Sequence, residues 1–230
     1  MQSGTTHNTV FTLRRYRSLV RPKLKVEVNG LDVNELQHIE WIMKSFQKPW
    51  YIAGGWAIDI ELGEVTREHK DMDICIFRED AAYALNYFQD WDIHVTIPGE
   101  NRLEPCKDIE DLKLPRYCLH LYKDNEFLEL LLTDRAEEEI VFRKNNEVRM
   151  KMKEFGKGSA TRPYVNPAWQ LLFKSLSTRK EDEHDFKIYR DRIQDKSSMK
   201  WLIDSMITTN GNKEWIEELR KQLEDGGDIL

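Results

Sequence analysis

The sequence lacks any long apolar run. In its 230 residues, no stretch approaches the roughly 20 apolar residues that a membrane-spanning helix needs. Hydrophobic residues make up 40% and charged residues 33% of the chain, a balance typical of a globular protein with one domain or two small ones. We therefore expect no membrane partner, and a chain long enough to bury a core.

Cysteines are few, and they show no paired spacing. Cys75, Cys106 and Cys118 are odd in number, and no Cys-x-x-Cys motif is present. This pattern is typical of reduced thiols and does not indicate a disulfide framework. It predicts a cytoplasmic location.

A general excess of positive charge is also lacking. The formal net charge of −6 disfavours a nucleic-acid-binding surface. The start of the chain differs, because no acidic residue precedes Glu27. Its later basic residues are Arg14, Arg15, Arg17, Arg21, Lys23 and Lys25. We expect residues 1–26 to form a basic N-terminal extension.

Residue patterns predict mixed helices and strands up to about residue 160. Helical spacing predicts helices at 34–46, 56–62 and 81–88. Apolar alternation and turn residues predict strands at 50–53, 71–77, 117–122 and 126–133, with a further hairpin at 139–143 and 148–152. These elements predict a mixed sheet with helices in residues 27–160.

The pattern becomes helical after the stretch 156–162. Asn166 is a good N-cap and Pro167 a good first helical residue. Helices are predicted at 167–177, 181–193, 198–208 and 213–223. The predicted fold class is therefore α+β, with residues 161–230 forming a helical C-terminal domain.

Two aspartates stand out in residues 51–77, which read YIAGGWAIDIELGEVTREHKDMDICIF. Asp71 and Asp73 are two residues apart on a predicted strand, so both carboxylates project from one face. Two such charges repel unless a cation lies between them. Mg²⁺ is commonly shared between one or two carboxylates and a substrate phosphate. The pair therefore predicts a divalent-cation site.

Two glycines precede this pair. Gly54 and Gly55 carry no side chains, so the backbone can approach a phosphate closely. The helix predicted after them would direct its N-terminal N–H groups at an anion. The glycines and the aspartates together predict metal-assisted phosphoryl or nucleotidyl transfer.

The same residues carry a family resemblance. GGWAID at 54–59 followed by REHKDMD at 67–73 resembles the nucleotidyltransferases of the DNA polymerase β superfamily. Within it, the chain looks most like bacterial aminoglycoside and lincosamide adenylyltransferase-like proteins. FLELLL at 127–132 and LLFKSLSTRKEDEHDF at 171–186 extend the likeness over roughly residues 35–220. The chain departs from that branch at Ser175 and Leu176, where Ala and Lys are more common.

The resemblance implies a nucleotidyltransferase-type mixed sheet and a particular reaction. Asp71 and Asp73 would hold Mg²⁺, or Mn²⁺, on ATP or another nucleoside triphosphate. A hydroxyl would attack the α-phosphorus, and pyrophosphate would leave. The implied partners are the nucleoside triphosphate and a small hydroxylated acceptor, for which an aminoglycoside or a lincosamide is a candidate.

A third carboxylate is expected on a neighbouring strand. Glu129 interrupts an apolar strand, and a carboxylate buried among leucines is costly unless it has a partner or a purpose. It could ligate the metal or accept the proton of the acceptor hydroxyl. Desolvation is expected to raise its pKa. Asp134 and Glu126 are the alternatives.

Basic residues complete the predicted nucleotide site. Arg67 could contact phosphates or pair with Glu64 or Glu68. The resemblance makes Lys174 a triphosphate contact, although a solvated helix end is an alternative. Asp59 is expected to hold the loop that carries Arg67. The acidic run 181–185 is expected to be a solvated helix face.

Other functions remain open from the sequence. One is nucleotidyl transfer to a protein or an RNA. Another is a non-catalytic nucleotide-binding or antitoxin-like relative, although the presence of both Asp71 and Asp73 favours catalysis. The preferred nucleotide and the oligomeric state are left open.

Overall fold

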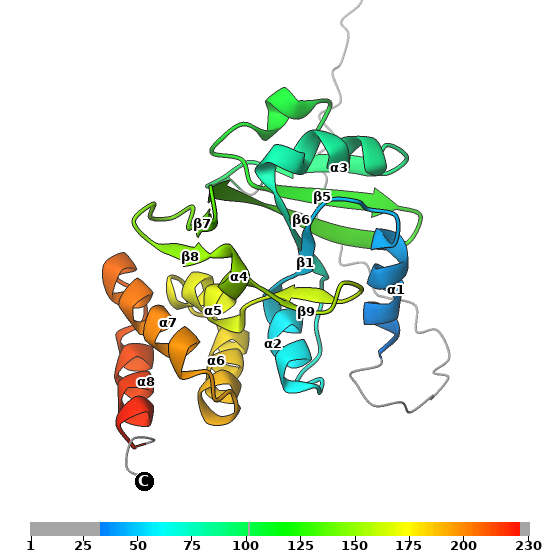
Figure 1. Cartoon of the computed structure of the whole chain (residues 1–230). Coiled ribbons are helices and arrows are strands. Elements are labelled where there is room, and N and C mark those ends of the chain that lie inside the picture. Colours follow the sequence, from blue (N-terminus) through cyan, green and yellow to red (C-terminus); the bar gives the residue numbers. More distant parts are fainter. Residues whose placement is uncertain (1–32, 101, 226–230) are drawn as a thin grey trace, which may run out of the picture.

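The computed structural model describes residues 33–100 and 102–225 (Figure 1). The predicted basic extension, residues 1–26, lies outside this part of the chain. The α-helices are α1 (Asn34–Met43), α2 (Gly54–Leu62), α3 (Ala81–Tyr87), α4 (Met152–Phe155), α5 (Pro167–Ser175), α6 (Lys180–Arg192), α7 (Lys196–Thr209) and α8 (Lys213–Asp225). No helix among the described residues is both long and apolar enough to cross a membrane.

The strands form one mixed sheet. They are β1 (Trp50–Ile52), β2 (Asp73–Phe77), β3 (Asp92–Thr96), β4 (Leu103–Pro105), β5 (Cys118–Lys123), β6 (Glu126–Ala136), β7 (Glu139–Val141), β8 (Arg149–Lys151), β9 (Gly156–Gly158) and β10 (Pro163–Val165). Their order is β4-β3-β5-β6-β2-β1-β10-β9. Outside this order, β7 pairs with both β6 and β8. β2 runs parallel to β6, and β1 runs parallel to β10. The predicted mixed sheet is confirmed.

One face of the sheet is closed by α1 and α3. On β6, Leu128, Leu130 and Leu132 are each at most 2% exposed and pack into a core with residues of both helices. Alternation along the strand turns Phe127 and Glu129 to the other face, where they are only partly buried. The part of the second face around Glu129 is therefore less covered than the first face.

A second core joins the sheet to the C-terminal helices. Asn166 caps α5 by accepting a hydrogen bond from the Ala168 N–H at 2.9 Å, as predicted. Phe186 of α6 stacks on Trp215 of α8, with ring centroids 4.3 Å apart. Helices α5 to α8 gather at the opposite end of the molecule from α3 (Figure 1).

Some element boundaries differ from the prediction. β10 pairs with β1, so the last strand of the sheet lies beyond residue 160. The division into domains at residue 160 stays a prediction. α2 begins at Gly54, two residues before the predicted start. The short strands β3 and β4 were not predicted, since their polar composition gives a weak strand pattern.

Candidate active site

Neighbouring strands bring three carboxylates to one edge of the open face. Asp73 on β2 lies opposite Glu129 on β6, and the Glu129 N–H donates to the Met72 carbonyl at 3.1 Å. Asp71 precedes β2 by two residues. We call Asp71, Asp73 and Glu129 the acidic edge. The parallel register of β2 and β6 thus places Asp73 beside Glu129, and Asp71 is near enough to Glu129 for that charge to raise its pKa.

The acidic edge concentrates like charges. Burial and the neighbouring Glu129 carboxylate together raise the pKa of Asp73 to about 7. Desolvation and Glu129 also raise the pKa of Asp71. The charge of Lys174 acts on Asp73 in the opposite direction but does not compensate. Without a bound cation, Asp73 is therefore partly protonated near neutral pH.

The expected rise in the pKa of Glu129 is wrong. Burial acts to raise this pKa, but hydrogen bonding and charge from His120 outweigh it, so the pKa of Glu129 is lowered. The His120 Nε2 atom lies 3.3 Å from Glu129 Oε1, because β5 places His120 directly opposite Glu129. The raised pKa values at the acidic edge therefore belong to Asp73 and Asp71.

The two alternative carboxylates have other partners. Asp134 accepts a hydrogen bond from Arg78 Nε at 2.6 Å. Glu126 lies 3.0 Å from His38 Nε2 on α1, which packs on the closed face of the sheet. Neither carboxylate is placed at the acidic edge, so Glu129 remains the stronger candidate.

The paired glycines make room for functional side chains. Gly54 has a φ of +64°, and a Cβ atom there would lie 2.1 Å from Asp73 Oδ2. A Cβ atom on Gly55 would lie 2.2 Å from Arg67 Nη2. The Gly54 N–H donates to Gln170 Oε1 of α5 at 3.0 Å. Both glycines therefore permit a close approach, and their predicted contact with phosphates stays a prediction.

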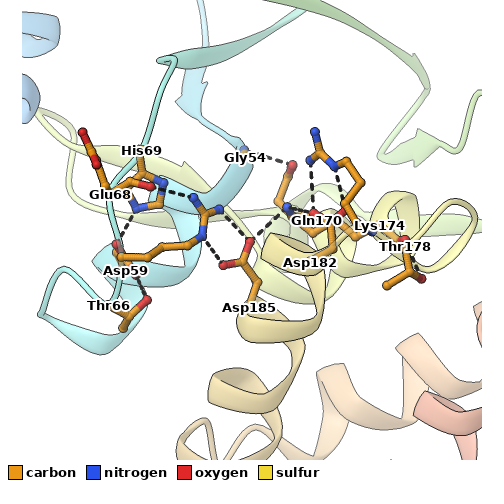
Figure 2. A network of polar contacts seen from close by, with 12 residues as sticks. Gly54, Asp59, Thr66, Glu68, His69, Gln170, Lys174, Thr178, Asp182 and Asp185 are labelled. Atoms are coloured by element: carbon orange, nitrogen blue, oxygen red, sulfur yellow. Dashed lines mark hydrogen bonds and ion pairs between the residues drawn. The ribbon is translucent and has the colours of Figure 1, made fainter.

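Asp59 holds the loop between α2 and the acidic edge. It accepts a hydrogen bond from Thr66 Oγ1 at 2.7 Å and lies 2.5 Å from His69 Nε2 (Figure 2). The His69 ring stacks on Trp56 of α2 with centroids 4.3 Å apart. The predicted holding role of Asp59 is confirmed, and the loop that leads to Asp71 is tied to α2.

Charged residues from this loop, α5 and α6 form a second cluster (Figure 2). We call it the ion-pair network; its members are Arg67, Lys174, Arg179, Asp182 and Asp185. Arg67 donates two hydrogen bonds to the Asp185 carboxylate, from Nε to Oδ1 at 2.7 Å and from Nη2 to Oδ2 at 2.8 Å. Lys174 Nζ lies 2.5 Å from Asp182 and 3.0 Å from Asp185.

The network corrects two expectations. The run 181–185 is not a uniformly solvated face, because Asp182 and Asp185 are 1% and 2% exposed. Their spacing of three residues turns both toward α5, which a consecutive acidic run conceals. Arg67 pairs with Asp185 instead of the Glu64 or Glu68 carboxylate, and it reaches Glu68 only at the backbone carbonyl.

The carboxylates of the network are well compensated. Burial alone would raise the pKa of Asp182, but hydrogen bonds from Arg179 and Lys174 lower it to about 2. Arg67 and Lys174 likewise lower the pKa of Asp185 against the effect of burial. Three cations face two carboxylates, so the network keeps a surplus of positive charge.

The acidic edge fits a hard divalent cation. Its donors are carboxylate oxygens, which Mg²⁺ prefers, and the pKa values of Asp71 and Asp73 stay raised despite the nearby charges of His120 and Lys174. A softer set, Cys118, His120 and Glu129, offers ligand atoms within 4.8 Å of one another. However, burial raises the pKa of the Cys118 thiol, which keeps it protonated and a poor ligand. The oxygen set is the better metal site.

Comparison with known families identified a match. Residues 35–102 match the family model for aminoglycoside-2''-adenylyltransferase. The match includes both glycines and both aspartates, ends before Glu129 and covers less than half of the chain. It confirms the predicted resemblance to adenylyltransferase-like nucleotidyltransferases, and with it the prediction of an enzyme.

Several solved structures are similar to this chain. Lincomycin-bound LnuA, a lincosamide antibiotic adenylyltransferase, is 20% identical, covers 71% of this chain and 99% of its own, and has a TM-score of 0.48. ANT(2'')-Ia in complex with adenylyl-2''-tobramycin is 16% identical, with coverages of 85% and 100% and a TM-score of 0.42. A nucleotidyltransferase-like protein from Paracoccidioides brasiliensis is 14% identical, with coverages of 83% and 84% and a TM-score of 0.35. The comparison with curated proteins found no match. At these TM-scores, the likenesses support no conclusion about the site.

Sequence reasoning missed three contributors to the site. His120 alternates with Cys118 and Tyr122 on a predicted strand, and the hairpin that follows could have indicated its place near Glu129. Asp182 and Asp185 share one helical face, a signal that their acidic neighbours masked.

Proposed function

We propose that this chain transfers a nucleoside monophosphate, AMP from ATP, to a hydroxyl group of a small molecule, with Mg²⁺ or Mn²⁺ as cofactor. The observation that carries the proposal is the acidic edge, where Asp73 lies opposite Glu129 and Asp71 lies close by. The raised pKa values of Asp71 and Asp73 are those of carboxylates that lack a cation. The family match supports the transferred group.

The three carboxylates have distinct roles in this proposal. Asp71, Asp73 and Glu129 would hold the metal, which when bound neutralises phosphate charge and makes the α-phosphorus more electrophilic. Glu129 is also placed to accept the proton of the attacking hydroxyl. The new bond joins that oxygen to the α-phosphorus, and the bond to pyrophosphate breaks.

The ion-pair network is proposed to receive the triphosphate. Its surplus positive charge complements phosphate, and Lys174 is near enough to Asp73 to affect its pKa. Gly54 and Gly55 at the start of α2 would let backbone N–H groups approach the phosphates. Arg67 and Lys174 would then contact phosphate oxygens while Asp185 keeps both side chains in position.

The proposed acceptor is a small hydroxylated molecule. The matched family acts by its name on aminoglycosides, and the similar structures contain lincomycin and an adenylylated tobramycin. Aminoglycosides and lincosamides are therefore the first acceptors to test. The three cysteines are free, which agrees with the proposed cytoplasmic location, where ATP is available.

A pyrophosphate-release screen tests the proposal. The protein is incubated with Mg²⁺ and each of the four common nucleoside triphosphates, with aminoglycosides and lincosamides as acceptors. We expect acceptor-dependent release with ATP and a product heavier than its acceptor by one adenylyl group. Asp73→Asn serves as the inactive control. Release that does not depend on any acceptor, or no release with any triphosphate, would contradict the proposal.

A further inference from the structure

Aromatic side chains line the open face of the sheet next to Glu129. Cross-strand register aligns His94 of β3, His120 of β5 and Glu129 of β6 in one row that ends at Asp73. A second row, one step along, contains Asp92, Tyr122 and Phe127. Residues directly opposite one another on neighbouring strands share a face. We call His94, His120, Tyr122 and Phe127 the aromatic face.

The four rings form a continuous surface. The Phe127 ring centroid lies 5.2 Å from that of His120 and 5.1 Å from that of Tyr122. The His94 and Tyr122 centroids are 6.0 Å apart. The surface spans from β6 to β3, a width of about 10 Å at the usual strand spacing. This width matches one or two sugar-sized rings.

The two faces of these strands differ in exposure. Leu119, Leu121 and Leu128 on the closed face are each 1% exposed. On the aromatic face, the His94 and His120 side chains are 24% and 18% exposed, and Tyr122 and Phe127 are also only partly buried. The rings thus combine apolar surface with polar side-chain atoms on a partly exposed face, a combination suited to a ring compound that carries hydroxyls.

The position of this face relative to the nucleotide favours the acceptor. α2 and the ion-pair network lie beyond β2, whereas β5 and β3 lie on the other side of Glu129. In an in-line displacement, the attacking oxygen approaches opposite the leaving pyrophosphate. With the triphosphate at the ion-pair network, the acceptor must approach over β5 and β3.

We propose that the aromatic face binds the acceptor, and that the acceptor is a hydroxylated ring compound with an apolar face and few positive charges. This inference rests on the proposed function. The apolar face of the compound stacks on Tyr122 and Phe127, which directs a hydroxyl toward Glu129. Among the described side chains of these two rows, Asp92 is the carboxylate beyond the acidic edge, and it can accept an amine. The shortage of further carboxylates disfavours a polycation.

Binding measurements with matched variants test the assignment. Phe127→Leu keeps apolar volume but removes the ring, and Phe127→Tyr restores the ring. Trp41→Leu is the control, because Trp41 is 70% exposed on α1, which covers the closed face. Lincomycin, with a lone amine and apolar groups, and tobramycin, with several amines, are titrated calorimetrically against protein saturated with Mg²⁺ and α,β-methylene-ATP.

We expect lincomycin to bind more tightly than tobramycin. Phe127→Leu should weaken lincomycin binding roughly 3- to 10-fold, as loss of one aromatic contact would. Phe127→Tyr and Trp41→Leu should bind it like the wild type, and the nucleotide analogue should bind equally to all four proteins. Thermal unfolding confirms that each variant is folded.

Two results separate this inference from the proposed function. If the wild type adenylylates either compound but Phe127→Leu leaves both its binding and its KM unchanged, the aromatic face is not the acceptor site and the proposed function stands. Tighter binding of tobramycin would overturn the predicted acceptor class. If the wild type binds the analogue but neither binds nor modifies either compound, both the inference and the proposed acceptor class fail.

Discussion

The acidic edge and the ion-pair network are two carboxylate clusters with opposite electrostatics. At the acidic edge, burial and the neighbouring Glu129 carboxylate together raise the pKa of Asp73 to about 7. In the network, Arg179 and Lys174 overcome burial and lower the pKa of Asp182 to about 2. The difference lies in the neighbours. Asp182 is paired with Arg179 and Lys174, whereas Asp73 lies beside the Glu129 carboxylate.

This difference separates the acidic edge, as a candidate ligand site, from the ion-pair network, whose internal pairs support the fold. A buried carboxylate that is paired and hydrogen-bonded is satisfied within the protein, and breaking such a pair costs stability. Like-charged carboxylates side by side cost stability until a cation arrives. We therefore assign metal binding to the acidic edge and positioning of Arg67 and Lys174 to the ion-pair network. The following predictions test this assignment.

The largest expected effect is on turnover. Glu129→Gln keeps the shape of the side chain but cannot accept a proton, so kcat should fall by roughly 10² to 10⁴. Steady-state kinetics with a competent acceptor measures this fall. Glu126→Gln on the same strand is the control, because its partner His38 lies on α1 over the closed face. If Mg·ATP binding collapses together with turnover, Glu129 is chiefly a metal ligand. Turnover near that of the wild type would show that Glu129 is not part of the active site.

Breaking the ion-pair network should cost stability. Asp185→Asn leaves Arg67 without its carboxylate and weakens the pairing of Lys174, at a cost of about 3 kcal/mol in the free energy of unfolding. Urea unfolding measures the difference. Glu181→Gln, an exposed neighbour on α6, should leave the free energy of unfolding nearly unchanged. Equal effects of the two substitutions would show that the network does not support the fold.

Removing a carboxylate from the acidic edge should have the opposite sign. In chelator at pH 8, Asp73→Asn should raise the free energy of unfolding by about 1 to 2 kcal/mol, because it relieves repulsion with Glu129 and Asp71. The gain should shrink as the pH falls from 7 toward 4, since wild-type Asp73 is then protonated. Asp182→Asn is the matched control and should be destabilising. A loss of stability in both variants would refute the contrast.

The smallest expected effect is the change in the free energy of unfolding at low pH. The pKa of Asp182 is about 2 in the folded protein, against 3.8 for the free side chain. A lowered pKa gives stability that is present above about pH 4 and is lost as the pH falls toward 2. The stability gap between wild type and Asp182→Asn should therefore narrow in urea unfolding at pH 3 relative to pH 5. A gap that widens at low pH would contradict the assigned pairing.

Local sequence patterns were sufficient where a single element determines the outcome. Asn166 with Pro167 indicated the start of α5. The pattern that predicted a strand over 71–77 found β2, although β2 begins at Asp73 and Asp71 lies just before it. Glu129 was found because a carboxylate in a leucine-rich strand is unusual. Each inference needed only the period of one strand or the cap of one helix.

Contacts between elements were beyond such patterns. The turn before β6 has Asp124 at a φ of 52° and pairs Lys123 with Glu126, and this register places His120 opposite Glu129. A hairpin one residue longer would have shifted that partner. The burial of Asp182 and Asp185 likewise depends on how α6 packs against α5 and the Arg67 loop. Sequence spacing alone does not determine that packing.

The most direct test of the account is the response of the acidic edge to a divalent cation. Thermal unfolding of wild type and Asp73→Asn is compared in chelator and in Mn²⁺ with α,β-methylene-ATP. We predict that metal and nucleotide together raise the Tm of the wild type by several degrees, as ligands that bind the folded state do. They should leave Asp73→Asn nearly unchanged. An equal rise in both proteins would contradict the assignment of the acidic edge as the metal site.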